Sequence, residues 1–302
     1  MDGKTMKLCL GTVQFGMNYG VQGNGQPHRE KVFDMILYAI SHGISMFDTA
    51  SAYGVAEEVL GEYIRGYPET SQNMRLVSKL KPDAFQGQPV GSWPGIVENN
   101  AIESLNKLGI NRLEAYLFHN AAYIFNPEAV ESMSVILEKG LADKIGVSIY
   151  TTDEAMKALE YSQIGAIQIP YNVFDRRLDR CGFFKKALAQ GVTVYARSSL
   201  LQGLLMMDPE NLPIRVSFAK KYLTEYLSIC QQFEISPLNA AIGYVTSKKG
   251  IDFVVFGVDN IQQLSEYIEI EKLKIPQKLI EAFDLAFGDV EEKLVNPALW
   301  NK

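Results

Sequence analysis

The stretch MFDTASAYG, residues 46–54, joins a strand-like apolar segment to two polar groups. Met46 and Phe47 suit a buried strand, but Asp48 follows them directly and Tyr53 comes five positions later, just before a glycine. A strand of a parallel sheet is buried on both faces and is normally apolar along its length. A carboxylate and a phenol at the end of such a strand therefore predict a functional position at one edge of a sheet.

The same succession of a short apolar run and a helical segment recurs along the whole chain. Within residues 29–41, for example, the apolar residues fall on one face of a helix. The strand-like runs cover residues 6–12, 43–50, 75–80, 112–120, 143–150, 164–172, 192–199 and 251–257. The helices expected after them cover residues 29–41, 57–64, 95–108, 126–139, 152–161, 181–190, 218–233 and 261–270. Eight such units predict an α/β protein with a (β/α)8 TIM barrel.

An open doubly wound sheet is the alternative architecture, and it usually carries a G-x-G-x-x-G turn after a strand, which this sequence lacks. No linker rich in Pro, Gly or Ser divides the chain, so residues 1–302 are expected to form a single barrel domain. Long loops are expected at the C-terminal mouth of the barrel, and an extra C-terminal helix should follow Pro276. The loops cover residues 83–95, 172–180 and 202–216.

Composition narrows the class of protein and its partners. The 302 residues are 47% hydrophobic and 21% charged, with a net charge of -6, which is ordinary for a globular protein and argues against nucleic acid as a partner. Three widely separated cysteines are typical of a reducing compartment, and no pair has the spacing of metal ligands. With no signal peptide and no long apolar stretch, a cytoplasmic protein with no membrane contact is expected, as a monomer or small homo-oligomer.

Most of the strand-like runs end on a polar side chain. These side chains are Asp48, Lys79, His119, Ser148, Gln168 and Arg197. Because parallel strands of a barrel point the same way, their carboxyl ends meet at one mouth, where the active sites of such barrels lie. Each residue alone has a structural explanation: Asp48 as a helix cap, Lys79 as a snorkelling side chain at a strand end, and His119 as a core histidine. Their convergence favours a catalytic site.

Tyr53 has a chemical role in such a group. A free phenol has a pKa of about 10 and is a weak acid at neutral pH. The ammonium of Lys79 is expected to lower that pKa, with Asp48 holding the lysine in place. His119 is then available to orient a substrate carbonyl or to relay the proton.

At these residues the sequence resembles the aldo-keto reductases, from LGTVQFG (residues 10–16) to VVFGVDNIQQLSEYIE (residues 254–269). The most specific segments are FDTASAYG, VSKL and LFHN, in the family's order. The resemblance implies a (β/α)8 barrel that binds a nicotinamide dinucleotide and transfers hydride to an aldehyde or ketone. It also implies that Tyr53 is the general acid, with Asp48 and Lys79 tuning it and His119 at the carbonyl.

The resemblance implies a set of cofactor-binding residues: Gly11, Thr12, Ser148, Gln168, Arg197, Ser198, Leu200, Gln202, Gly257, Asp259 and Gln263. Two positions depart from the family pattern. Ile149 stands where an asparagine normally follows the serine, and Arg197 stands where an aromatic ring normally lies under the nicotinamide. Arg197 could stack as a plane or reach a phosphate or an acidic substrate. Residues 256–269 contain no Lys or Arg, so NADP is expected only from the habit of the family, and NAD stays open.

A small carbonyl compound is the expected substrate, and its walls are expected to come from the loops after the first and sixth strands. The candidates are Phe15, Tyr19, Tyr171, Asn172 and Phe174. Arg176 and Arg177 are either solvated charges or readers of an acidic group. Besides a carbonyl reductase, two other functions stay open: a cofactor-binding redox sensor or regulatory subunit with little turnover, and a Schiff-base aldolase acting through Lys79.

Overall fold

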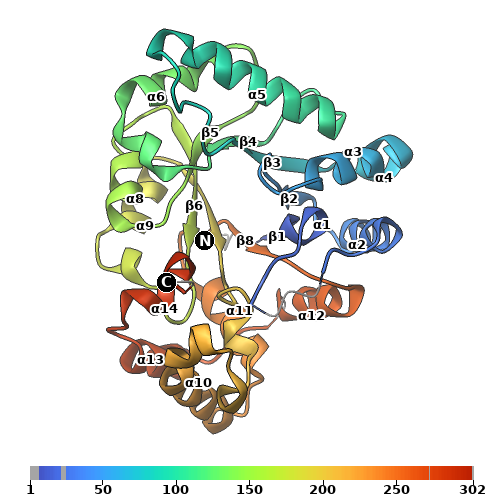
Figure 1. Cartoon of the computed structure of the whole chain (residues 1–302). Coiled ribbons are helices and arrows are strands. Elements are labelled where there is room, and N and C mark those ends of the chain that lie inside the picture. The colour runs from blue at the N-terminus through green and yellow to red at the C-terminus, as the bar shows by residue number, and fades with distance from the viewer. Residues whose placement is uncertain (1–6, 22–24, 272, 301–302) are drawn as a thin grey trace.

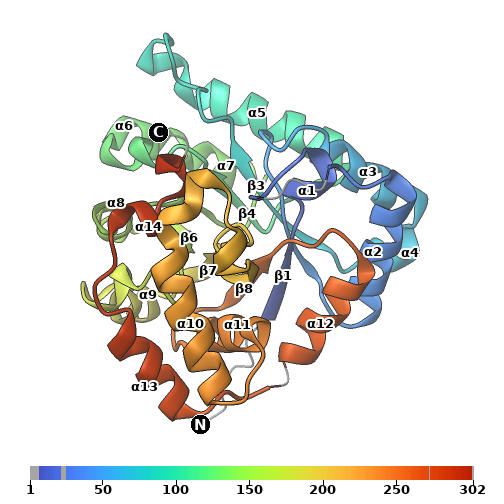
Figure 2. The same ribbon diagram turned by 60° about the horizontal axis from the view of Figure 1, so that its bottom comes forward.

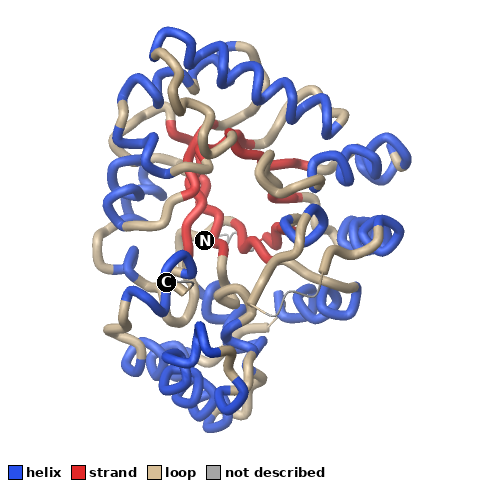
Figure 3. The backbone as a smooth tube through the Cα atoms, viewed as in Figure 1, coloured by secondary structure: helices blue, strands red, loops and turns tan. Residues whose placement is uncertain are grey.

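The computed structural model describes residues 7–21, 25–271 and 273–300, and in this part of the chain eight parallel strands close into a barrel. Figures 1 and 3 show the ring of strands with helices arranged around it. The strands are β1 Lys7–Gly11, β2 Met46–Asp48, β3 Arg75–Leu80, β4 Ala115–Phe118, β5 Ile145–Ser148, β6 Ile164–Pro170, β7 Thr193–Arg197 and β8 Phe253–Phe256. The expected (β/α)8 barrel is therefore confirmed. Residue 6 of the expected first strand, and residues 1–5, 22–24, 272, 301 and 302 of the expected domain, lie outside the described residues.

The helices that cover the barrel come mostly from the segments with a helical period. They are α2 Arg29–Ser41, α3 Ala56–Gly66, α5 Trp93–Leu108, α6 Pro127–Ser132, α7 Ser134–Glu138, α8 Thr152–Ala158, α9 Phe183–Ala189, α10 Lys220–Gln232, α11 Pro237–Ser247, α12 Ile261–Glu271 and α13 Gln277–Ala286. Three single turns complete the set: α1 Val13–Gly16, α4 Pro68–Ser71 and α14 Glu292–Val295. Within the described residues, none of these helices has the length and apolar character that crossing a bilayer requires.

The strands are apolar on both faces because one face packs inside the barrel and the other packs against the surrounding helices. One face fills the inside of the barrel, with Cys9, Met46, Val77, Ala115, Leu117, Ala166, Tyr195, Phe253 and Val255 in one buried cluster. The other face packs against the helices in a second, larger cluster. Burial on both faces explains the continuous apolar runs of the sequence.

One segment differs from the expected order. The sequence analysis treated residues 218–233 as the helix between β7 and β8 and did not predict α11. In the structure α11 directly precedes β8 and packs against α12, whereas α10 packs against α11 and α13. Figure 2 shows α10 between α11 and α13 on the side of the barrel. The expected extra C-terminal helix is α13.

Candidate active site

The strand register brings the polar strand ends to one mouth. Gly11 pairs with Asp48 across β1 and β2, Ser148 pairs with Gln168 across β5 and β6, and Pro170 pairs with Arg197 across β6 and β7. These pairs lie at the carboxyl ends of their strands, so their side chains share one end of the barrel.

Lys79 of β3 lies at the bottom of this mouth with its side chain fully buried. Its ammonium nitrogen is 2.8 Å from Oδ1 of Asp48, 2.7 Å from the carbonyl oxygen of Thr49 and 3.5 Å from the hydroxyl of Tyr53. An ammonium has three N–H donors, and each of these three has an acceptor here. The pair of Lys79 and Asp48 is therefore a shielded ion pair that points one donor at the phenol.

Asp48 is also held from the other side of the barrel. Nε2 of Gln168 donates to Oδ1 of Asp48 at 2.7 Å, and the hydroxyl of Ser148 donates to Oε1 of Gln168 at 3.1 Å. All three side chains are buried. A hydrogen-bonded chain therefore runs from the end of β5 through β6 and β2 to Lys79.

Tyr53 lies in the loop between β2 and α3, where two glycines let the loop approach α1. A Cβ on Gly16 would lie 1.8 Å from the carbonyl oxygen of Tyr53, and a Cβ on Gly54, whose φ is +57°, would lie 2.3 Å from the carbonyl oxygen of Gly16. Any side chain at either position would push the Tyr53 loop away from α1. The close approach of these backbones thus fixes where the phenol stands.

The pKa of Tyr53 differs from the expectation. Burial, and after it the negative charge of Asp48, raise the pKa of the phenol well above its usual value. The sequence analysis expected Lys79 to lower it, but the ammonium is already paired with Asp48, so its charge is largely balanced. Tyr53 is therefore neutral and carries its proton at physiological pH.

His119 directly follows β4 and packs edge-on against the ring of Tyr53, with ring centroids 5.7 Å apart. Burial, and then the charges of Lys79 and Arg197, lower the pKa of its imidazole to about 3. The ring is therefore uncharged through the neutral range and can donate one N–H. Its Nδ1 is buried and has no hydrogen-bond partner in the described part of the chain.

A cavity of about 810 Å³ opens above this group. Fifteen of the predicted site residues line this cavity: Gly11, Thr12, Tyr19, Asp48, Tyr53, His119, Ser148, Gln168, Arg197, Ser198, Leu200, Gln202, Gly257, Asp259 and Gln263. Lys79 does not line it, and its buried ammonium lies behind Asp48 and Tyr53. The predicted residues thus come together around one space. The third function, an aldolase, is not compatible with Lys79, because the amine is buried and fully hydrogen-bonded.

Four residues expected to form the substrate wall do not line this cavity. Phe15, Tyr171, Asn172 and Phe174 are all buried. The ring of Tyr171 packs against Phe184 of α9, and the ring of Phe174 packs against Phe287, so both face the helical layer. Asn172 accepts hydrogen bonds from the backbone N–H groups of the next turn and stabilises the loop instead.

Other lining residues were not predicted. Gln14 lies on the lining after β1, Tyr150 after β5, and Pro297 and Ala298 come from the C-terminal tail. A signal for Tyr150 existed, since it lies two positions after the strand end at Ser148. Pro297 and Ala298 reach the cavity because the C-terminal tail folds back over the mouth. No local sequence pattern predicts such a long-range return of the chain. Ile149, a departure from the family pattern, is buried and is not among the lining residues.

Comparison with known proteins agrees with the fold. The chain is 26% identical over 286 residues to aldo-keto reductase YhdN of Bacillus subtilis, a match that covers 87% of this chain and 84% of that protein. It is 27% identical over 216 residues to the NADH-specific methylglyoxal reductase of Escherichia coli, covering 66% of this chain and 65% of that protein. Aldo-keto reductase AKR11C1 from Bacillus halodurans shares the fold, with a TM-score of 0.75, 19% identity and coverage of 96% and 95% of the two chains.

A family model described as the aldo/keto reductase family matches residues 7–286, which is most of the chain. This match, together with relatives that are named as reductases, supports catalysis over the alternative of a cofactor sensor with little turnover. The chain belongs to the aldo/keto reductase family and is an NAD(P)H-dependent carbonyl reductase.

Proposed function

We propose that the protein reduces a small aldehyde or ketone to an alcohol in this cavity, with Tyr53 as the proton donor. The observation that carries this proposal is the position of the Tyr53 hydroxyl. It lies on the cavity wall, 3.5 Å from the ammonium of the buried Lys79, and its ring packs against His119. A general acid must stand within reach of the oxygen it protonates, and this phenol combines a place on the cavity wall with a contact to the buried ammonium.

Each polar residue then has one task. The uncharged imidazole of His119 donates a hydrogen bond to the substrate carbonyl and orients it. Tyr53 gives its proton to the oxygen of the developing alkoxide, which is a much stronger base than a phenolate, so the raised pKa of Tyr53 does not prevent the transfer. Lys79 stabilises the phenolate that remains, and Asp48 keeps Lys79 in position.

The residues of the cavity fit a nicotinamide dinucleotide, which supplies the hydride when bound. Ser148 and Gln168 line the same cavity as Tyr53 and offer a hydroxyl and an amide, as recognition of a carboxamide requires. At β8, the bare backbone of Gly257 adjoins Gln14, whose buried Oε1 has no partner in the described part of the chain. An orphaned acceptor facing a cavity is a natural site for a ligand donor.

We propose that the preferred cofactor is NADH, in place of the NADPH that the family habit suggested. The stretch after β8 contributes the carboxylates of Asp259 and Glu266 to the lining, together with Gln263. Among the described lining residues Arg197 is the one cation with a fixed charge, and it lies with His119 and not with this stretch. Two carboxylates repel a 2′-phosphate. The relative in Escherichia coli that is named as NADH-specific supports this choice.

Fluorescence titration with NADH and NADPH in parallel tests the cofactor preference. We expect the Kd for NADH to be about tenfold lower or more, which corresponds to about 1.4 kcal/mol. Glu266→Lys should narrow the difference by improving NADPH binding. Tighter binding of NADPH by the unmodified protein would contradict the proposal.

Consumption of NADH in the presence of small aldehydes tests the reaction itself. We expect turnover to follow carbonyl reactivity, with the alcohol as product. A protein that binds NADH and consumes none with any of a broad set of aldehydes and ketones would contradict the proposed reduction. The single domain, the cytoplasmic location, the absence of a nucleic-acid partner and the monomeric or small homo-oligomeric state stay predictions.

A further inference from the structure

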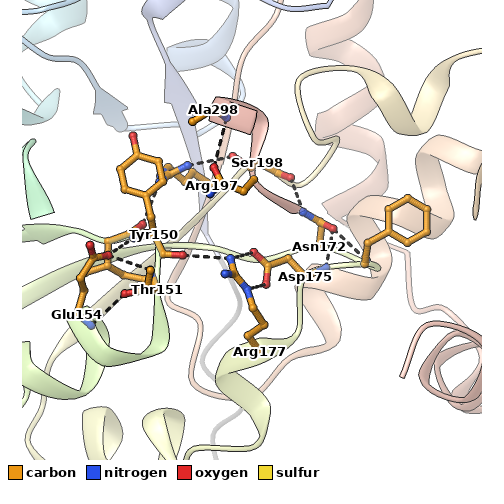
Figure 4. Close-up of polar contacts among 12 residues, drawn as sticks. Tyr150, Thr151, Glu154, Asn172, Asp175, Arg177, Arg197, Ser198 and Ala298 are labelled. Atoms are coloured by element: carbon orange, nitrogen blue, oxygen red, sulfur yellow. Dashed lines mark hydrogen bonds and ion pairs between the residues drawn. The ribbon is translucent and has the colours of Figure 1, made fainter. Parts of the chain in front are cut away.

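Arg197 ends β7 and is the feature of the cavity that the reduction described above does not use. Its Nη2 donates to the carbonyl oxygen of Ile149 at 2.9 Å, and its Nη1 donates to the hydroxyl of Ser198 at 3.2 Å. The guanidinium carbon lies 4.5 Å from the centre of the Tyr150 ring. Figure 4 shows Arg197 beside Tyr150 and Ser198. All these partners are neutral, so within the described residues no carboxylate balances the charge of Arg197.

The two other arginines suggested as readers of an acidic group are already paired. Arg177 donates to both carboxylate oxygens of Asp175 at 2.8 Å, as Figure 4 also shows. Arg176 forms an ion pair with Asp284. Neither residue lines the cavity. Of the two alternatives left open for Arg176 and Arg177, binding an anion in this cavity has no support, and Arg197 is the arginine that the cavity exposes.

The charge of Arg197 acts where the substrate carbonyl would lie. After burial and Lys79, Arg197 is the third cause that lowers the pKa of His119. The charge of Lys79 is balanced by Asp48, whereas no carboxylate in the described part of the chain balances that of Arg197. A guanidinium has five N–H donors in a planar fork, and two of them are taken up by Ile149 and Ser198. The remaining donors suit the two oxygens of a planar anion.

Stacking of Arg197 under a nicotinamide ring is the competing role. One face of the guanidinium already lies over Tyr150, so the group is positioned by an aromatic ring of the protein itself. The carbonyl oxygen of Ile149 and the hydroxyl of Ser198 further fix its plane. Arg197 is half-buried and held rigidly, and it has no counter-ion among the described residues. Such a cation favours a ligand that carries a negative charge.

We propose that Arg197 binds an anionic group of the substrate, so that the enzyme prefers aldehydes or ketones that carry a carboxylate or a phosphate close to the carbonyl. This inference rests on the proposed reduction in the same cavity. The anion binds through the free edge of the guanidinium, while His119 and Tyr53 hold the carbonyl oxygen. Tyr150 and Ser198 act as positioning residues for Arg197.

Matched pairs of substrates test the inference. 4-Carboxybenzaldehyde and benzaldehyde differ by a carboxylate, and glyceraldehyde 3-phosphate and glyceraldehyde differ by a phosphate, so the two pairs distinguish the two anions. We expect the ratio of kcat/KM for the charged over the neutral member to exceed tenfold in at least one pair. Arg197→Gln should lower that ratio at least tenfold, since the charge-assisted hydrogen bonds to the anion are lost. Arg197→Lys should retain part of it, because it keeps the charge and loses the fork.

Arg176→Gln is the matched control, because it removes an equal charge from a neighbouring loop at a residue that is paired with Asp284 and does not line the cavity. It should leave the ratio as it is. A ratio near one in the unmodified enzyme for both pairs would overturn the inference. A ratio that Arg197→Gln does not change, with weaker NADH binding in the same variant, would overturn it as well and assign Arg197 to the cofactor.

A binding measurement separates this inference from the proposed reduction. Benzoate and benzamide are titrated into the NADH complex, with NADH fluorescence as the signal. We expect benzoate to bind, benzamide to bind at least tenfold more weakly, and Arg197→Gln to remove the difference. If benzoate binds in this way and no aldehyde is reduced, the proposed function fails and the anion site stands. If both compounds bind equally, the anion site fails whatever the enzyme reduces.

Discussion

The ammonium group of Lys79 is fully buried and has an acceptor for each of its N–H donors: Asp48, the Thr49 carbonyl and Tyr53. A charge in such surroundings is stable only with a partner. Removing one member of a buried ion pair leaves the other charge buried and uncompensated, which destabilises the folded protein. This pairing also determines chemistry. With its nitrogen held in place, Lys79 cannot attack a carbonyl carbon, and its effect on a substrate passes through the phenol.

Lys79→Met tests the role of this pair. We expect the free energy of unfolding to fall by about 3–5 kcal/mol, because Asp48 loses its counter-ion. We also expect kcat/KM to fall by about 10²–10⁴-fold, because the phenolate of Tyr53 is no longer stabilised. Urea unfolding and NADH consumption measure the two effects.

The double variant Asp48→Asn with Lys79→Met separates stability from catalysis. It removes both charges, so it should recover much of the lost stability and none of the lost activity. Recovery of turnover together with stability would show that Lys79 acts only as a structural partner of Asp48, contrary to the mechanism.

At the level of elements, the contact between α1 and the β2–α3 loop positions Tyr53. The carbonyl oxygen of Tyr53 accepts a hydrogen bond from the N–H of Ala56 at 3.1 Å, and the N–H of Val55 approaches the carbonyl oxygen of Gly16 at 3.4 Å. These contacts are made by backbone atoms, which cannot move aside as a flexible side chain can. The position of the phenol therefore depends on the absence of a side chain at Gly16.

Gly16→Ala should therefore lower kcat more than it changes cofactor binding. The added Cβ would meet the Tyr53 carbonyl oxygen at 1.8 Å, so the loop must shift and carry the phenol away from its place. We expect a loss of kcat on the order of 10²-fold, as a misplacement of about 1 Å in a catalytic group produces. Steady-state kinetics and NADH titration measure the two quantities.

Gly95→Ala is the control for this variant. Gly95 lies in the first turn of α5, and a Cβ there would meet nothing within 4 Å. Alanine has the higher helix propensity, so this variant should be as active as the parent and equally or more stable. Equal activity of both glycine variants would contradict the positional argument for Gly16.

The sequence predicted the elements well where period and burial agree. The strand runs and the helix α2 follow directly from their apolar patterns. Helix α11 was missed because six consecutive residues, 240–245, are buried, so it shows no polar face. Its start did carry a signal, since Ser236 caps the helix and Pro237 is its first residue.

The site was predictable to the extent that it lies on strand ends. Asp48, Lys79 and Gln168 follow from the strand register, which a barrel imposes on all its members. The direction of a side chain in a loop has no such rule. Phe15 and Tyr171 therefore could not be assigned to the core or to the mouth from their positions alone, and both lie in the core.

For the whole molecule, the two ends of the barrel have separate roles. At the N-terminal end, opposite the cavity, Glu114 directly precedes β4. Its carboxylate accepts hydrogen bonds from Nε of Arg75 at 2.8 Å and from Nζ of Lys144 at 2.6 Å. Glu114 and its two partners thus join the starts of β3, β4 and β5. Burial alone would raise the pKa of the Glu114 carboxyl. The positive charges of Lys144 and Arg75 outweigh burial and hold this pKa below its usual value. Such a cluster supports the closure of the barrel and takes no part in chemistry.

Glu114→Gln should reduce stability and leave kcat unchanged. We expect a loss of about 1–2 kcal/mol at neutral pH, since Arg75 and Lys144 are partly exposed. Because the folded protein lowers the pKa of this carboxyl, its contribution is present above the pKa of an unfolded glutamate, about 4.3, and is lost as the pH falls through the lower folded value. The stability difference between parent and variant should therefore shrink in acid. Urea unfolding at several pH values tests this, and a lower kcat at neutral pH would contradict the separation of the two ends.

The central claim is that Tyr53, which contacts Lys79 and packs against His119, protonates the substrate oxygen. Single-turnover oxidation of bound NADH by an aldehyde, followed in the parent and in Tyr53→Phe, tests it most directly. The account predicts that the variant binds NADH with a similar Kd and oxidises it about 10²–10⁴-fold more slowly. Oxidation of NADH at the parental rate in Tyr53→Phe would contradict it.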